Sequence, residues 1–336
     1  MRSFYLTGKG AGSRIKGMKR NILLLLIVSL IAMSCSGTSL AYWIWTPKTG
    51  KFINPKYAAK ESPQKQFDWA MSFFESEDYK RAITEFEKLL KHYPLSKLAS
   101  RAQFHLAAAY EKMGEYYRAF ENYQEVIDKY PYTEKVEEII EREYRIANLF
   151  YSGRKAKILG LALLPAKTRA IEIFAKVVEN SPYGEYAPLA QYKLGECYMQ
   201  MKDYINAALA FKKIIENYPK SPLIDDAKYK IAMCAANAAT GPEYNEEDTD
   251  KAIKEFKDFV RRYPDSQMEK EARHFINKLE NQKAENHFNI ARFYERQSNL
   301  DSAIIYYEEV LNKYPTSEWA AKALEKLQII RKEVKK

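Results

Sequence analysis

Few side chains in this sequence could do chemistry. The 336 residues include three cysteines and the histidines His92, His105, His274 and His287. Catalytic and metal sites built from these residue types need a second such group at a defined spacing, and no histidine has a His, a Cys or paired carboxylates three or four positions ahead. A glycine-rich phosphate loop, a G-x-S-x-G turn and an H-E-x-x-H helix are also missing. We therefore expect no enzyme, no metal, no cofactor and no small-molecule substrate.

Cys35 is the one cysteine whose neighbours indicate a covalent modification. It follows a basic stretch and the apolar run 22–33, which as a helix spans roughly 18 Å, short of the ~30 Å core of a bilayer. Such a run is typical of a signal peptide, for which Met18 is an alternative start. The segment Ala32-Met33-Ser34-Cys35 resembles the lipobox of bacterial lipoproteins, which implies cleavage before Cys35 and acyl chains on it. The alternative is an ordinary secreted protein with an incidental cysteine.

The rest of the sequence is repetitive. Six apolar helical segments each end in a proline, namely Pro94, Pro131, Pro182, Pro219, Pro264 and Pro315. Eight positions before each proline lies an aromatic residue: Phe86, Tyr123, Phe174, Phe211, Phe256 and Tyr307. Twelve positions before it lies an alanine: Ala82, Ala119, Ala170, Ala207, Ala252 and Ala303. A further small residue precedes these in each repeat: Ala70, Ala107, Ala147, Gly195, Ala232 and Ala291.

This is the pattern of tetratricopeptide (TPR) repeats, each a pair of helices joined by a turn. Small residues let the two helices approach closely, the aromatic side chain fills the gap between successive hairpins, and proline ends the second helix. We therefore predict an all-α protein, a right-handed α-solenoid of about six TPR helix hairpins. Insertions predict loops at about 152–167 and 240–248, an extra helix is expected at about 267–283, and a capping helix at about 317–334. The apolar side of the cap would hold Trp319, Leu324, Leu327 and Ile330.

The same pattern divides the chain into segments. These are a signal peptide (1–34), a lipid-anchored tether (35–62), an array of repeats one to three (63–184), and an array of repeats four to six with the capping helix (185–336). Cys197 and Cys234 each follow the small residue of the first helix by two positions. Their equivalent places in neighbouring repeats favour packing in the core, although a disulfide between them is the alternative in an oxidising compartment.

Residues 42–55 precede the repeats and are rich in aromatic side chains. Pro47 and Gly50 indicate a turn, so a short β-hairpin or extended segment is expected. Tyr42, Ile44 and Phe52 would then share one face, and Trp43 and Trp45 the other. The segment lies close to the predicted lipid anchor, so three roles stay open: contact with the membrane interface, addition to a partner's sheet, and packing on the first repeat.

TPR solenoids bind extended peptides in a groove lined mainly by the first helix of each hairpin. The groove candidates, taken at the concave positions of repeats one, two and four, are Phe67, Met71, Phe74, Phe104, Ala108, Glu111, Tyr192, Glu196 and Met199. An exposed stripe of Phe67, Met71 and Phe74 would suit a peptide with aromatic side chains. The alternative is that these three residues pack against the N-terminal segment or a neighbouring helix.

The net charge of +10 suggests nucleic acid as a partner, but its distribution argues against this. Residues 1–34 hold six basic residues and no acidic one, so the chain from Cys35 onward carries +4. That excess lies within residues 35–66, and from Phe67 onward acidic and basic residues balance. We therefore expect a neutral solenoid with no nucleic-acid partner, on a basic tether beside the membrane.

Over about 204–316 the chain resembles the BamD family (YfiO-type), lipoproteins of the β-barrel assembly machinery. The likeness lies in the hairpin ending at Pro219, the insertion before Ala252, the Tyr263-Pro264-Asp265-Ser266 end, an extra helix, and Ala291-Arg292-Phe293-Tyr294. Residues 63–151 are similar to the family's opening two repeats. The resemblance implies a lipid-anchored protein on the periplasmic face of the outer membrane. It also implies C-terminal repeats that dock the POTRA domains of a barrel protein, with Arg292, Tyr294, Arg296 and Tyr307 as candidates, and an N-terminal groove for peptides of unfolded outer-membrane proteins.

Other TPR lipoproteins of the cell envelope are the alternative. A pilus or secretion pilotin would bind a pilin or secretin subunit, and a cell-division coordinator would bind a Tol-type partner. A peptidoglycan-associated scaffold is a further alternative. None of these would dock a barrel protein, so the identity of the bound partner separates them from the first hypothesis.

Overall fold

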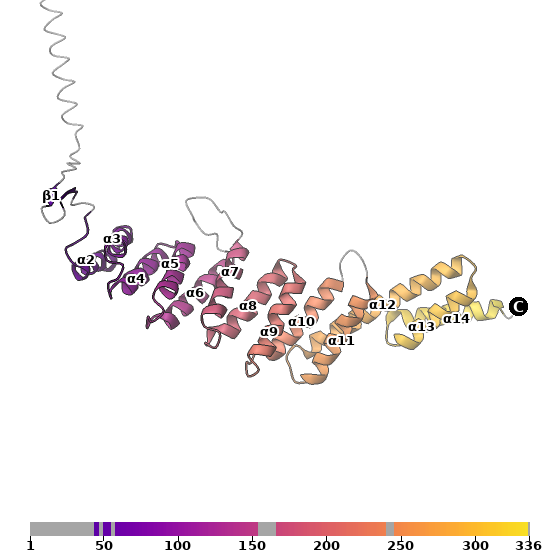
Figure 1. Cartoon of the computed structure of the whole chain (residues 1–336). Coiled ribbons are helices and arrows are strands. Elements are labelled where there is room, and N and C mark those ends of the chain that lie inside the picture. The colour runs from indigo at the N-terminus through magenta and orange to yellow at the C-terminus, as the bar shows by residue number, and fades with distance from the viewer. Residues whose placement is uncertain (1–43, 47–49, 55–57, 154–165, 240–244, 335–336) are drawn as a thin grey trace, which may run out of the picture. The chain divides into compact units, whose positions relative to one another are not determined.

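The structure is a computed structural model that describes residues 44–46, 50–54, 58–153, 166–239 and 245–334 (Figure 1). It separates into two compact units, Met1–Ser62 and Pro63–Lys336. Cys35, the predicted signal peptide, Tyr42 and Trp43 lie outside the described residues. Among the helices in the described ranges, none is both long and apolar enough to cross a bilayer.

The first unit holds the predicted β-hairpin. Strands β1 (Ile44–Thr46) and β2 (Lys51–Ile53) pair antiparallel, and Gly50 precedes the second strand with φ of 60°, a conformation that glycine adopts without strain. Trp45 lies opposite Phe52, with ring centroids 5.2 Å apart. Directly opposed residues share a face of the ladder, so the prediction that Phe52 and Trp45 lie on different faces is wrong.

The second unit is a series of helix hairpins, as predicted. The first helices, called A helices below, are α2 (Pro63–Glu75), α4 (Ala99–Lys112), α6 (Val136–Tyr151), α8 (Tyr186–Gln200) and α10 (Ile224–Ala239). Their B helices are α3 (Tyr79–His92), α5 (Tyr116–Lys129), α7 (Ala166–Asn180), α9 (Tyr204–Asn217) and α11 (Glu246–Arg262). The sixth hairpin consists of α12 (Glu269–Arg296) and α13 (Leu300–Lys313), and α14 (Glu318–Val334) follows it as the cap. Each helix packs against the next in the chain (Figure 1).

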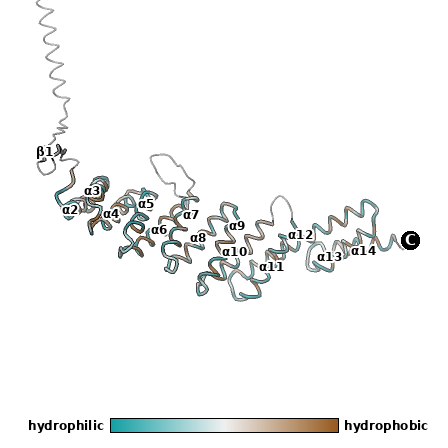
Figure 2. Tube along the Cα trace, in the orientation of Figure 1, coloured by the Kyte–Doolittle hydropathy of each residue, from teal (hydrophilic) through white to brown (hydrophobic). Residues whose placement is uncertain are grey.

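The repeated residues form the core of this solenoid. All six alanines, all six aromatic residues and all six small residues named above are buried. Figure 2 shows apolar and hydrophilic residues mixed along each helix, as expected where one face is buried and the other solvated. Gly195 shows why the A helix needs small residues: a Cβ there would lie 2.7 Å from the ring of Phe211.

The Tyr-Pro-x-Ser sequence between repeats builds the turn from one hairpin to the next. Tyr93 caps α3, with its backbone N–H donating to the carbonyl of Leu89 at 2.8 Å. The hydroxyl of Ser96 then accepts a 3.2 Å bond from the backbone N–H of Leu98, immediately before α4. The same contact recurs at the hydroxyls of Thr133, Ser221 and Ser266.

The region of the sixth hairpin differs from the prediction in one respect. The extra helix expected at 267–283 is not separate, because α12 runs unbroken for 28 residues. Its sequence contains neither glycine nor proline, so nothing interrupts the backbone hydrogen bonds. Ile276 and Leu279 in its first half join the core formed with α11, whereas Phe288 and Ala291 in its second half join the core formed with α13.

Two smaller expectations also change. The predicted loop 240–248 ends at Asn245, whose side chain caps α11 by accepting a 3.0 Å bond from the N–H of Glu247. The acidic residues Glu246, Glu247 and Asp248 therefore form the first turn of a helix, where negative charge is favoured. In α14, Trp319, Leu327 and Ile330 contribute to the core as predicted, but Leu324 is 48% exposed.

Both cysteines of the solenoid are buried and unpaired, as the repeat pattern predicts. Cys197 belongs to the core around hairpins two to four and Cys234 to that around hairpins four and five. Burial raises the thiol pKa of each to about 12, so neither is a reactive thiolate at neutral pH.

Candidate functional site

The A-helix face of the first hairpin is more closed than predicted. Phe67 is only 4% exposed, and its ring packs 5.9 Å from those of Phe86 and His105. Met71 and Phe74 are half-buried and pack against the same core. The expectation of an exposed Phe67, Met71 and Phe74 stripe is therefore wrong, because the second hairpin covers it.

His105 lies at the centre of this closed region. Its ring is within 6 Å of Phe67, Phe74, Phe86 and Phe104. Burial, together with the positive charges of nearby basic side chains, lowers the pKa of His105 to about 4. The imidazole is thus neutral at physiological pH and acts as one more aromatic packing group.

The groove candidates of the second hairpin are held by internal contacts. Phe104 and Ala108 are each 5% exposed. Glu111 Oε2 accepts a 2.8 Å bond from the hydroxyl of Tyr123 and a 2.9 Å bond from Arg142 Nη1 of the next hairpin. Glu111 therefore joins hairpins two and three instead of presenting a free carboxylate.

The same arrangement recurs at the end of the solenoid. The buried hydroxyl of Tyr307 donates to Glu295 Oε2 at 2.6 Å, and Lys326 of α14 donates to Glu295 Oε1 at 2.8 Å. In both cases twelve positions separate the tyrosine from the glutamate. Tyr307 is wholly buried, so its prediction as a docking residue is wrong.

A buried amide row that the sequence analysis missed runs along the A helices. Gln66, Gln103 and Gln191 are each buried and lie four positions before the small residue. Each donates through Nε2 to a backbone carbonyl nineteen positions later in its B helix, at 2.9, 3.4 and 3.0 Å, respectively. The regular spacing of these glutamines was a readable signal. The acceptors are Glu85, Asn122 and Ala210.

Hairpin three departs from this row. Glu143 occupies the equivalent position and is wholly buried. Its Oε1 accepts a 2.7 Å bond from Gln124, whereas its Oε2 has no hydrogen-bond partner. Burial raises the pKa of Glu143 to about 8, so the folded protein holds it as a neutral acid at physiological pH.

Two of the three groove candidates of the fourth hairpin, Glu196 and Met199, line a cavity. Glu196, Met199 and Gln200 of α8 border a cavity of about 290 Å³, together with Tyr151 of α6 and Lys230 of α10. Tyr151 donates to Glu196 at 3.1 Å. Three successive A helices therefore converge here, as expected of a peptide groove. Tyr192 is half-buried against the ring of Phe211, 5.3 Å away.

The predicted docking residues at the end of α12 lie mostly on the surface. Arg292 and Arg296 are exposed, and Tyr294 is half-buried, stacked on Tyr306 at 5.6 Å. Phe293, which the sequence analysis did not single out, is 49% exposed beside them. The end of α12 thus has two arginines and a phenylalanine at its surface.

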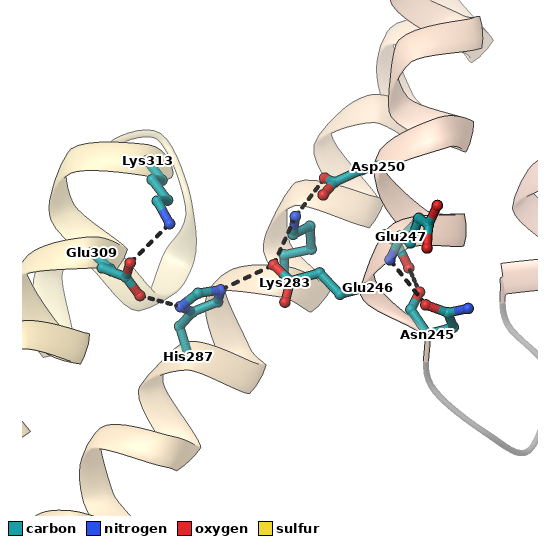
Figure 3. Close-up of polar contacts among 9 residues, drawn as sticks. Asn245, Glu246, Glu247, Asp250, Lys283, His287, Glu309 and Lys313 are labelled. Atoms are coloured by element: carbon teal, nitrogen blue, oxygen red, sulfur yellow. Dashed lines mark hydrogen bonds and ion pairs between the residues drawn. The ribbon is translucent and has the colours of Figure 1, made fainter.

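A buried ionic cluster joins the last two hairpins (Figure 3). Lys283 is 4% exposed and contacts Asp250 and Glu246 at the start of α11. The two ring nitrogens of His287 lie 2.9 Å from Glu309 and 3.4 Å from Glu246. Although burial alone would lower it, the bonds from Asp250 and Glu246 raise the pKa of Lys283, so the ammonium stays charged. Within the described residues, no three His, Cys, Asp or Glu side chains are grouped so as to hold a metal.

Several solved structures are similar to the chain at low identity. A tetratricopeptide repeat protein from Parabacteroides merdae is 15% identical, covering 80% of this chain and 98% of that one, with a TM-score of 0.32. YrrB, a TPR protein with an unusual peptide-binding site, is 17% identical over 64% and 93%, with a TM-score of 0.33. PilW, a type IV pilus biogenesis factor, is 18% identical over 79% and 100%, with a TM-score of 0.28. TM-scores this low say nothing about function.

The sequence also matches a family model. No curated protein matches the chain at a significant level. The model of the YfiO family, described as outer membrane lipoprotein, matches residues 59–140 and 166–335, which include every described hairpin at least in part. The gap in the match corresponds to the end of α6 and the insertion after it. The chain therefore belongs to the YfiO family of outer membrane lipoproteins.

Proposed function

We propose that this protein is a non-enzymatic scaffold of the outer-membrane β-barrel assembly machinery. The observation that carries the proposal is the match to the YfiO family along the solenoid. On this proposal Cys35 carries the lipid anchor, and the solenoid lies at the periplasmic face of the outer membrane. Its role is to hold two kinds of polypeptide near each other, the POTRA domains of a barrel-forming partner and segments of unfolded outer-membrane proteins.

Two surfaces support these two binding roles, one for an unfolded segment and one for the barrel-forming partner. The cavity bordered by Tyr151, Glu196 and Lys230 offers hydrogen-bonding groups on three A helices, which suits an extended peptide. The end of α12 offers exposed Arg292, Phe293 and Arg296, a mixture of aromatic and arginine side chains common at protein interfaces.

The test is co-purification of the full-length, membrane-anchored protein from solubilised envelopes, with mass spectrometry of what it retains. We expect a POTRA-containing barrel protein, and we expect Arg292→Glu with Arg296→Glu to lower its recovery about tenfold or more. Lys278→Glu, an exposed change on the same helix, is the matched control and should leave recovery unchanged. Recovery of pilin, secretin, Tol or peptidoglycan-bound proteins in place of a barrel protein would instead favour a pilotin or another envelope scaffold.

Lipid anchoring has its own test. Cells fed a radiolabelled or alkyne fatty acid should incorporate it into the wild-type protein but not into a Cys35→Ala variant, which should leave the membrane fraction. Retention of Cys35→Ala in the outer membrane without label would show that another element anchors the protein.

A further inference from the structure

Three basic side chains of hairpins two and three gather over two buried rings on the A helices of hairpins one and two. Arg101 Cζ lies 4.9 Å from the ring centroid of Phe67. Lys135 Nζ and Arg142 Cζ lie 5.2 and 5.4 Å from the ring centroid of Phe104. We call Arg101, Lys135 and Arg142 the basic patch. Their charged groups lie above an aromatic floor that holds them by cation–π contacts.

The carboxylates beside the basic patch do not neutralise it. Lys135 and Arg142 share Glu138, at 2.8 Å each, and Arg142 also binds Glu111. In the described part of the chain, Arg101 has no carboxylate within ion-pair distance. Arg145, with its side chain 54% exposed and 3.7 Å from Glu111, adds a fourth cation. Four positive groups thus face two negative ones.

The buried imidazole of His105 lies close enough to the basic patch for the patch to lower its pKa. After burial, the causes that lower its pKa are the charges of Arg101, Lys135 and Arg142, opposed only by Glu138. A proton on this imidazole is therefore disfavoured by every member of the basic patch.

Farther along the same face, acidic side chains lie beside basic ones. Asp226, at the start of α10, has a raised pKa because of burial and because of the negative charges of Asp225 and Glu196, with Lys230 opposing them. Glu196 is also a member of the cavity described above. The A helices of hairpins four and five thus carry both charges, with Glu196 paired to Lys193 at 2.7 Å and Lys230 lining the same cavity, whereas the basic patch has an excess of cations.

We propose that the basic patch binds acidic side chains of an extended polypeptide segment that lies along the A-helix face. The proposal rests on the peptide-binding function proposed above and adds the chemistry of the ligand. Several separated cations suit several carboxylates better than one, so the occupant is a segment with spaced Asp or Glu residues. Partly exposed ion pairs such as Lys135–Glu138 contribute little to stability, so a ligand carboxylate exchanges with Glu138 at little cost. Specificity then comes from charge complementarity between the basic patch and the acidic side chains of the ligand.

The test uses the full chain and two labelled synthetic peptides. One alternates Asp with Phe or Leu over twelve residues, and the other has Asn in place of every Asp. The variant Arg101→Glu with Lys135→Glu reverses the charge of the two exposed members of the basic patch and spares Arg142, which joins two hairpins. Lys129→Glu, an equally exposed lysine on the B helix α5, is the matched control. Circular dichroism melting checks that all three proteins are folded.

We expect the Asp peptide to bind at least about tenfold more tightly than the Asn peptide, with an affinity that falls as salt rises. The Arg101→Glu, Lys135→Glu variant should remove this difference, and Lys129→Glu should keep it. Equal affinity of the two peptides for the wild-type protein would overturn the proposal while leaving peptide binding intact. Failure of both peptides to bind would contradict the proposed peptide groove itself. Tighter binding of single-stranded DNA or phosphatidylglycerol vesicles, lost in the double variant, would assign the basic patch to another polyanion and also overturn the proposal.

Discussion

The hydroxyl of Tyr123 donates a 2.8 Å hydrogen bond to Glu111, which also receives Arg142 from the following hairpin. The equivalent residues of hairpin four are Phe211 and Met199, so an aromatic hydroxyl and a carboxylate occur together or not at all at these two positions. Hairpins two and three are therefore joined by a polar contact at positions where hairpin four has the apolar side chains of Phe211 and Met199. Because Glu111 makes this contact, its carboxylate stabilises the fold, although the sequence pattern predicts it as a ligand-binding residue.

Removing only the carboxylate should be costly. We expect Glu111→Ala to lower the free energy of unfolding by about 2–4 kcal/mol, because in a half-buried site the Tyr123 hydroxyl loses its partner and Arg142 keeps only Glu138. The double change Tyr123→Phe with Glu111→Met copies hairpin four and should recover at least about 1 kcal/mol of that loss. Urea unfolding followed by circular dichroism measures both. A double variant less stable than Glu111→Ala would refute this account.

Glu143 should make stability depend on pH in an unusual direction. Its folded pKa of about 8 lies above the ordinary glutamate value of 4.5, so the native state keeps a proton that the unfolded chain has lost between these values. Its contribution is therefore fully present below about pH 4.5 and falls as the pH rises to about 8. Glu143→Gln supplies the amide found at Gln66, Gln103 and Gln191 and should remove this dependence.

The measurement for Glu143 is a series of urea titrations at about pH 5, 6.5 and 8. Each pKa unit corresponds to about 1.4 kcal/mol, so a difference of about 2 kcal/mol or more between wild type and Glu143→Gln is expected at the highest pH. Gln103→Glu is the matched reverse change and should introduce the same pH dependence into hairpin two. Parallel curves for wild type and Glu143→Gln would show that Glu143 is not held neutral.

Gly195 should not tolerate even one methyl group. A Cβ would lie 2.7 Å from the ring of Phe211, so Gly195→Ala is expected to cost about 1–3 kcal/mol through overpacking. Phe211→Leu removes the ring that the new methyl group would meet. The melting temperature of the double variant should therefore fall by less than the sum of the two single decreases. If Gly195→Ala melts at the wild-type temperature, the close approach of these helices is not as described.

A single change in a turn between an A helix and its B helix should raise the stability of the protein. Lys202 has φ of 62°, a conformation in which glycine, as at Gly114 with φ of 77°, avoids steric strain. Lys202→Gly is expected to raise stability by about 0.5–1 kcal/mol, and Gly114→Ala to lower it by a similar amount. The urea midpoint of unfolding should rise for Lys202→Gly and fall for Gly114→Ala. A lower midpoint for both variants would mean that the entropy of the unfolded chain outweighs the backbone strain.

The Lys283 cluster should respond asymmetrically to mutation. Lys283 is buried, whereas Asp250 and Glu246 keep 58% and 50% of their side chains exposed. Removing both carboxylates leaves a buried ammonium without a partner and should lower the free energy of unfolding by about 3–5 kcal/mol. Lys283→Met leaves only solvated carboxylates and should lower it by less than about 1 kcal/mol. Calorimetry of the two variants would contradict this if Lys283→Met proved the less stable.

The sequence predicted most of the fold because the repeats are dictated by local sterics. Alanine, aromatic and proline positions such as Ala119, Tyr123 and Pro131 decide where helices touch and end, and a period of this kind is visible without coordinates. The surface was harder to predict. Whether Phe67 faces a groove or the next hairpin depends on how closely α4 covers α2, and repeat position alone does not encode that distance. Lys283 and His287 come together with residues 22 to 41 positions away, beyond any short spacing rule.

The unbroken α12 also has a mechanical consequence. At 1.5 Å per residue, its 28 residues form a rod of about 42 Å that is shared by two cores. In most repeat arrays a terminal hairpin can detach without its neighbour, but here the fifth and sixth hairpins must fray or hold as one cooperative block. If a partner binds at Arg296, as proposed above, a pulling force on that end of α12 would be resisted by the packing of Ile276 and Leu279 against α11.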